Sequence, residues 1–187
     1  MSLVLASRSP RRQQLLAALG LKFEVVVVDV VEDAKENEEP EEMTLRLAES
    51  KARQVCRVVG KGCRVIGGDT VVALDGKIMG KPQNREHAMA MLTELSGRTH
   101  RVLSAVALIE DSHCRKRLSE SRVTFARLTR QQITRYCDTR DPYDKAGAYG
   151  IQGEAGHFVT ELAGSYSGVV GLPLWHLHQL LFEPAKS

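Results

Sequence analysis

The chain has 187 residues, of which 43% are hydrophobic and 26% charged, and its 26 basic and 23 acidic side chains leave a formal net charge of +3. This composition excludes disordered and fibrous chains and is typical of a globular protein that buries a sizeable core. The charge is too small for a polyanion-binding arm, and aromatic residues, at 5%, are too few for a nucleic-acid stacking platform. We therefore expect a single domain over residues 1–187 with no nucleic-acid partner.

The cysteines and the hydropathy of the chain indicate in which cellular compartment the protein is expected. None of the four cysteines forms a C-x-x-C pair or lies at zinc-ligand spacing to a histidine, so we expect reduced thiols. No stretch approaches the roughly 18 apolar residues that a membrane span requires, and the N-terminus has no basic region typical of a signal peptide. These features predict a cytoplasmic protein with no membrane partner.

The first elements alternate between strand and helix. Residues 3–6 form a short apolar run that predicts a buried strand. Ser9 and Pro10 predict the start of a helix that ends at Gly20, because Ser is a good N-cap and Pro is favoured at the first helical position. Residues 23–28 are rich in β-branched side chains and predict a second strand.

The rest of the chain continues this alternation. The acidic segment 32–42 predicts a solvated loop, and residues 41–58 have helical periodicity. A strand over residues 64–68 is expected to end at Asp69 and Thr70, and residues 71–74 continue extended to a hairpin turn at Asp75 and Gly76. Further predicted elements are a helix over 85–95, strands over 102–109 and 122–126, a helix over 129–137, an ordered loop over 141–156, a strand over 157–162, a loop over 164–168 and a helix over 173–182. The alternation predicts an α/β protein with a mixed, largely open sheet covered by helices.

Residues 6–12 have the features of an anion site. A strand that runs directly into a helix start leaves backbone N–H groups and the positive end of the helix dipole available to a ligand. Ser7 and Ser9 add hydroxyl donors, and Arg11 and Arg12 add guanidinium groups whose shape suits phosphate. The alternative is an ordinary helix cap followed by solvent-exposed arginines.

Two further segments carry a carboxylate and a cation. Gly67 and Gly68 precede Asp69 at what we expect to be the end of a strand, where glycines let a ligand approach the backbone and a carboxylate can accept a proton or bind a metal. Lys81 lies between a glycine and a proline, a plausible phosphate contact. The alternatives are a turn aspartate before a hairpin and a surface lysine.

The segment 144–153 combines three glycines with Lys, Tyr and Gln. Ordering such a loop costs conformational entropy, so an ordered loop of this composition indicates a function. The alternative is a flexible surface loop, which fits poorly with its apolar residues. His100 is better explained by a structural hydrogen bond than by catalysis. Together these segments supply the cations, carboxylates and amide that a nucleoside triphosphate with a divalent cation would use.

At these residues the chain resembles the Maf family of nucleotide pyrophosphatases over nearly its whole length. The matching blocks are residues 5–12, 49–52, 68–72, 80–82, 96–100, 144–153 and 164–173. The resemblance implies a three-layer α/β fold of the Maf/ITPase-like kind, with an elongated mixed β-sheet flanked by helices and two lobes around a deep cleft. It also implies a homodimer and a reaction that needs Mg²⁺ or Mn²⁺.

The resemblance further implies roles for individual residues. Asp69 corresponds to the catalytic proton acceptor, and Glu32 to a carboxylate that assists with metal or water, so the implied metal ligands are Glu32 and Asp69. The expected phosphate-binding residues are Ser7, from its place at the strand end, and the family's cations Arg12, Lys51 and Lys81.

The family has subgroups that hydrolyse nucleotides with different bases, and the residues at three positions separate these subgroups. In this chain the three residues are Arg11, Thr70 and Gln152. This combination resembles the dTTP/UTP pyrophosphatase subgroup, and a Gln amide offers the donor and acceptor that a pyrimidine edge requires. The 7-methyl-GTP subgroup has an aromatic residue, Gln and Glu instead, which suit a cationic purine. Hydrolysis of 7-methyl-GTP or other modified nucleotides stays the alternative, as does a nucleotide-binding regulator of septum formation, although the presence of Asp69 favours an enzyme.

Overall fold

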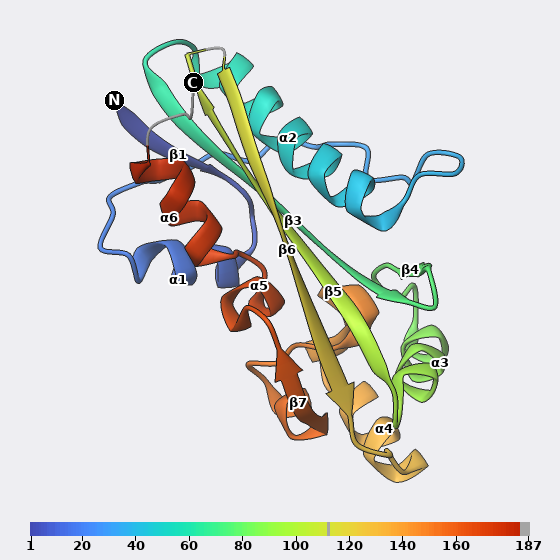
Figure 1. Ribbon diagram of the computed structural model, residues 1–187. Coiled ribbons are helices and arrows are strands. Elements are labelled where there is room, and N and C mark those ends of the chain that lie inside the picture. Colours follow the sequence, from blue (N-terminus) through green and yellow to red (C-terminus); the bar gives the residue numbers. More distant parts are fainter. Residues whose placement is uncertain (112, 184–187) are drawn as a thin grey trace.

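The computed structural model describes residues 1–111 and 113–183 and contains a seven-stranded mixed sheet with the order β2-β1-β3-β5-β6-β7, in which β4 also pairs with β3 (Figure 1). The strands are β1 (Ser2–Ala6), β2 (Glu24–Val25), β3 (Cys63–Leu74), β4 (Lys77–Met79), β5 (Thr99–Glu110), β6 (His113–Phe125) and β7 (Val159–Ala163). The helices are α1 (Pro10–Ala17), α2 (Pro40–Val59), α3 (Arg85–Leu95), α4 (Arg130–Cys137), α5 (Tyr166–Val170) and α6 (Leu174–Phe182), with 3₁₀ turns η1 (Asp141–Asp144), η2 (Ala146–Ala148) and η3 (Glu154–Phe158). Among the described helices, none is long and apolar enough to cross a membrane.

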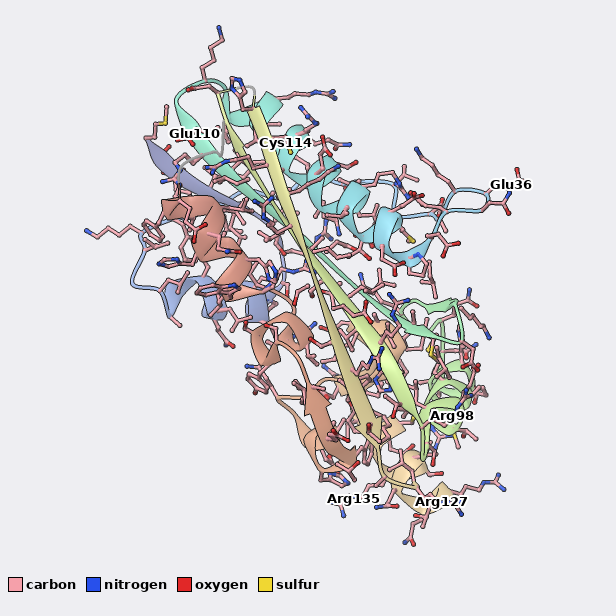
Figure 2. All side chains as sticks on the ribbon, in the orientation of Figure 1. Glu36, Arg98, Glu110, Cys114, Arg127 and Arg135 are labelled. Atoms are coloured by element: carbon pink, nitrogen blue, oxygen red, sulfur yellow. The ribbon has the colours of Figure 1, made fainter. Side chains whose placement is uncertain are left out.

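Three long antiparallel strands give the molecule its elongated shape. The strands β3, β5 and β6 run through its whole length, and Figure 2 shows Glu110 and Cys114 at one end of the β5–β6 pair and Arg98 and Arg127 near the other. The parallel strands β1 and β2 extend the sheet at the first end, and β7 extends it at the second. Each end of the sheet therefore supports its own lobe.

The first lobe has three layers, because neighbouring side chains of a strand point to opposite faces of the sheet. One face packs Val4, Val65 and Ala105 against α2, and the other packs Leu5 and Ile66 against α1 and α6. In Figure 1, α2 accordingly lies on one side of the long strands and α1 and α6 on the other. The predicted three-layer α/β fold with an elongated mixed sheet is confirmed.

The second lobe has a core of its own around α3, α4 and the 3₁₀ turns. Phe125, Tyr136, Phe158 and Leu92 are all fully buried there, and the aromatic rings meet edge to face, with 5.3 Å between the centroids of Tyr136 and Phe158. This packing keeps the segment 141–156 ordered, as its apolar residues predict.

Several elements differ from the sequence predictions. The strand expected over residues 23–28 is only Glu24–Val25, because β1 ends at Ala6 and residues 26–28 run past its last paired residue. β6 begins at His113 rather than near residue 122: its first half is highly charged but pairs with β5 along its whole length. The loop expected over residues 164–168 contains the start of α5, and β7 begins only after the turn η3.

The prediction that β3 ends at Asp69 is wrong in an informative way. β3 continues without a break to Leu74, and its edge opposite β5 pairs with β1 as far as Gly67 and with β4 from Val72 onward. Between these two pairings the described chain adds no strand to that edge. Asp69 therefore lies at a gap in the sheet edge rather than at a strand end.

Candidate active site

A cleft of about 850 Å³ opens at this gap and separates the two lobes. Its lining comes from the segments 6–12, 27–33, 69–72, 78–81, 144–152 and 169–171 together with side chains of α2 and β5. The cleft thus collects all four segments that the sequence singled out. The expected two-lobed arrangement around a deep cleft is present.

Two carboxylates and one ammonium group meet at the centre of the cleft. The Lys51 Nζ, on α2, lies 2.6 Å from the Asp69 Oδ1 and 2.6 Å from the Glu32 Oε1. The Lys81 Nζ lies 3.7 Å from the other oxygen of Glu32 and is largely exposed. Burial alone would raise the pKa of Glu32, but the hydrogen bond from Lys51 and the charges of Lys51, Lys81 and Arg12 outweigh it and lower the pKa. The charged form of Glu32 is therefore favoured beside these cations.

Arg12 lies on the other side of β3. Its guanidinium donates to the Gly171 carbonyl oxygen at 2.7 Å, the Thr70 hydroxyl at 3.2 Å and the Ser7 hydroxyl at 3.4 Å. Burial lowers the pKa of Arg12, and the charge of Asp69 opposes that effect. These three acceptors hold the guanidinium in one orientation.

The glycine pair before Asp69 has a packing role that the sequence did not predict. A Cβ on Gly67 would clash with the Ala48 carbonyl oxygen and lie 2.9 Å from the Ala52 Cβ, so α2 could not lie this close to β3. A Cβ on Gly68 would lie 3.4 Å from the Arg12 Nε. Gly67 thus admits α2 on one face of β3, and Arg12 lies against Gly68 on the other face, so Lys51 and Arg12 approach β3 from opposite faces.

Ser7 and the start of α1 form the floor of the cleft near Arg12. The Ser7 hydroxyl is buried and accepts the Ser9 N–H at 3.2 Å. Ser9 occupies the N-cap position of α1, but its side chain makes no capping hydrogen bond, contrary to the usual behaviour of an N-cap serine. The first turn of α1 thus lines the cleft without a side-chain cap, an arrangement that suits an anion.

The three positions expected to select the base do not form one cluster. Arg11 donates to the Asp144 carboxylate at 3.0 Å, and Gln152 lies exposed on the same loop side of the cleft with no side-chain hydrogen bond to the described chain. Thr70 lies on β3, where its hydroxyl is 2.7 Å from that of Ser104 and accepts from Arg12. Arg11 and Gln152 can contact a ligand directly, whereas the Thr70 hydroxyl accepts a hydrogen bond from Arg12 and helps to orient its guanidinium.

The loop that carries Gln152 is fixed by contacts that sequence patterns could not reveal. Lys145 bonds the carboxylates of Asp141 at 2.9 Å and Asp144 at 2.6 Å, and Gly150 and Gly153 wrap around these side chains so closely that a Cβ on either would clash. His100 and Tyr149 share a buried hydrogen bond of 2.7 Å, and burial lowers the pKa of His100 to about 4. His100 therefore has the geometry of the structural residue expected from the sequence.

The donor set at the centre of the cleft fits a divalent cation that arrives with its ligand. Asp69 and Glu32 already converge on one positively charged atom, and Mg²⁺ sites commonly combine one or two carboxylates with substrate phosphates. Over residues 1–111 and 113–183 there is no group of three or more His, Cys, Asp or Glu side chains that could hold a metal by itself. A cation at Asp69 and Glu32 would need further oxygen ligands from phosphate or water.

The sheet and cleft define an α/β protein whose candidate site gathers carboxylates and cations. The chain belongs to the family described as Maf-like protein, whose profile matches residues 2–183. A protein of Escherichia coli (strain K12) named dTTP/UTP pyrophosphatase is 47% identical over 180 residues, which cover 96% of this chain and 91% of that protein. A protein of the same name from Vibrio vulnificus (strain YJ016) is 46% identical, with 97% of each chain covered. Another, from Alkalilimnicola ehrlichii, is 50% identical, with 96% of this chain and 91% of that protein covered.

The chain also resembles a solved structure over part of its length. The Ham1 protein of Staphylococcus aureus aligns with a TM-score of 0.47 at 16% identity, over 67% of this chain and 72% of that one. This likeness is too partial to support an argument about the site.

Proposed function

We propose that this protein is a nucleoside triphosphate pyrophosphatase that hydrolyses dTTP and UTP to the nucleoside monophosphate and pyrophosphate. The observation that carries the proposal is the meeting of Asp69, Glu32 and Lys51 in a cleft lined by further cations. The relatives named dTTP/UTP pyrophosphatase support it, because they align with this chain over almost its whole length.

In this proposal the cations bind the triphosphate. Lys51 has three N–H donors, of which two are used by Asp69 and Glu32, so the third can reach a phosphate oxygen without breaking either contact. Lys81 is exposed beside Glu32 and can bind a second phosphate. The start of α1, with Ser7 and Arg12 beside it, supplies backbone and side-chain donors for a third.

Asp69 serves as the general base. Its carboxylate accepts a proton from a water molecule while the water oxygen forms a bond to phosphorus at the α–β anhydride, and the bridging P–O bond breaks so that pyrophosphate leaves. Glu32 lies beside it on the same lysine and orients the water or the phosphates. A divalent cation, Mg²⁺ or Mn²⁺, held by Asp69 and Glu32 would offset the charge that develops on the phosphate oxygens.

Base selection in this proposal belongs mainly to Arg11 and Gln152. The Gln152 amide is free to offer one donor and one acceptor, which matches the carbonyl and N–H edge of uracil or thymine. Arg11 is held toward the same side by Asp144 and can donate to a base carbonyl. Thr70 contributes indirectly, since its hydroxyl fixes Arg12.

The test is pyrophosphate release from a panel of nucleoside triphosphates with Mg²⁺ or Mn²⁺. We expect dTTP and UTP to have the highest kcat/KM, above CTP, ATP, GTP and 7-methyl-GTP. A preference for 7-methyl-GTP would support the alternative substrate class and contradict the role given to Gln152. Release of pyrophosphate from none of these nucleotides would contradict the proposal itself.

We also propose a cytosolic homodimer. All four cysteines are free thiols, which supports a reducing compartment. Tyr166, Trp175 and Phe182 are exposed on α5 and α6, and exposed aromatic side chains of this kind favour association. Light scattering coupled to gel filtration should give twice the mass of the chain, and the mass of a monomer would contradict this part of the proposal.

A further inference from the structure

Glu32 lies at the start of a segment that has almost no packing of its own. We call residues 31–39 the acidic strap: its side chains are exposed except that of Glu38, and Figure 2 shows Glu36 far out at its tip. Val31 is 75% exposed, so no apolar side chain fixes the strap near Glu32. A segment with so few buried contacts opens easily unless another interaction holds it.

Arg46 on α2 supplies that interaction. Its Nε and Nη2 donate to the two carboxylate oxygens of Glu38 at 2.5 and 2.6 Å, and Nη2 also donates to the Asp33 carbonyl oxygen at 3.1 Å. The Glu38 side chain is 7% exposed and also accepts the Lys35 N–H at 3.1 Å. The hydrogen bond from Arg46 lowers the pKa of Glu38 to about 2. Bidentate pairs between Arg and a carboxylate are among the strongest charge-assisted hydrogen bonds in proteins.

The contact with Asp33 connects the pair to the active site. Asp33 directly follows Glu32, so the guanidinium holds the backbone next to the carboxylate that meets Lys51 at 2.6 Å and Lys81 at 3.7 Å. Arg46 and Lys51 lie on the same rigid helix. One end of the strap is therefore fixed to the helix that also carries the lysine at the centre of the cleft.

We infer that Arg46 and Glu38 are positioning residues: they clamp the acidic strap so that Glu32 stays beside Lys51 and Asp69. The inference rests on the proposed function for its kinetic consequence, but the order of the strap can be tested without any substrate. A purely structural pair would stabilise the fold without acting through Glu32.

Limited trypsin digestion tests the clamp directly, because Lys35 is an exposed cleavage site within the strap. Glu38→Gln removes the charge and keeps the shape, and we expect cleavage after Lys35 to be at least about tenfold faster than in the wild type, since loss of a charge-assisted pair favours local opening. Arg46→Met should act in the same way. Arg53→Met is the matched control, because Arg53 pairs with Glu49 on the same helix and does not touch the strap. Equal cleavage after Lys35 in all four proteins would overturn the inference.

A double-mutant cycle with Glu32→Gln separates positioning from stability. In the wild-type background we expect Arg46→Met to lower kcat for UTP by at least about tenfold, the lower end for a misplaced catalytic group, with KM changed by less than about threefold. In the Glu32→Gln background the same change should have almost no further effect on kcat. Equal effects in both backgrounds would show that Arg46 does not act through Glu32 and would overturn the inference. If wild-type protein released no pyrophosphate, the proposed function would fail while the digestion result still decided the clamp.

Discussion

Replacing Lys51 by Met tests the centre of the cleft, because it removes the ammonium group and keeps most of the methylene chain. The variant leaves Asp69 and Glu32 close together with no cation between them. Removing one partner of a buried ion pair typically destabilises a protein by about 3–5 kcal/mol. The side chains of Lys51 and Asp69 are 14% and 10% exposed, but that of Glu32 is 47% exposed, so solvent screens part of the repulsion. We therefore expect a loss of about 2–3 kcal/mol, which lowers the Tm of a chain of this size by about 4–12 °C.

The same variant should also change the pH dependence of stability. The pKa of Glu32 in the folded protein is lower than its ordinary value of 4.5, so its interactions stabilise the fold above that pH and are lost as the pH falls through the lower folded pKa. Without Lys51 most of this stabilisation is absent. The difference in Tm between wild type and variant should be complete at pH 7 and should decrease below about pH 4.5.

Thermal unfolding followed by circular dichroism, with kcat/KM for UTP, dTTP and GTP, checks these expectations. Because a phosphate contact does not distinguish bases, all three substrates should lose activity by a similar factor. Lys116→Met is the control: Lys116 pairs with Glu49 on the surface at 2.7 Å, and surface pairs of this kind contribute roughly 0–1 kcal/mol. A Tm of Lys51→Met within about 1 °C of that of the control, or a loss of activity confined to one base, would contradict these roles of Lys51.

Three further predictions follow from the site. Asp69→Asn should keep the fold and nucleotide binding but lower kcat by at least about 100-fold, the typical contribution of a general base, and a variant within about threefold of wild type in a steady-state assay would remove Asp69 from that role. EDTA should abolish pyrophosphate release and added Mg²⁺ or Mn²⁺ should restore it, whereas full turnover in chelator would contradict a metal at Asp69 and Glu32. Gln152→Ala should lower kcat/KM for dTTP and UTP by up to about tenfold, the value of one neutral hydrogen bond, and an equal loss for every nucleotide would rule out base recognition by this side chain.

The sequence predicted the parts of the site that depend on local pattern. Ser7, Arg11 and Arg12 follow a buried strand at a helix start, and this placement holds in the structure because it depends only on neighbouring residues. The sequence also predicts that the segment 144–153 is ordered, and its residues Ala148 and Tyr149 are buried.

What the sequence could not predict depends on contacts between distant segments. The sequence predicts a strand end open to a ligand at Gly67 and Gly68, but both glycines lie within β3, and Gly67 makes room for α2. The pairing of Arg11 with Asp144 joins residues 133 positions apart, and no local pattern indicates it. The place of Glu32 similarly depends on a distant residue, Arg46 on α2, which bonds Glu38 and the Asp33 carbonyl oxygen.

In the proposed reaction, Asp69 is the base and the bond between the α- and β-phosphates of the nucleotide is hydrolysed in the cleft. The most direct test of this reaction is chromatography of the products formed from UTP and Mg²⁺ by wild-type protein and by Asp69→Asn. We expect UMP and pyrophosphate in equal amounts from the wild type and almost none from the variant. UDP and orthophosphate as the products, or UMP formed equally fast by both proteins, would contradict it.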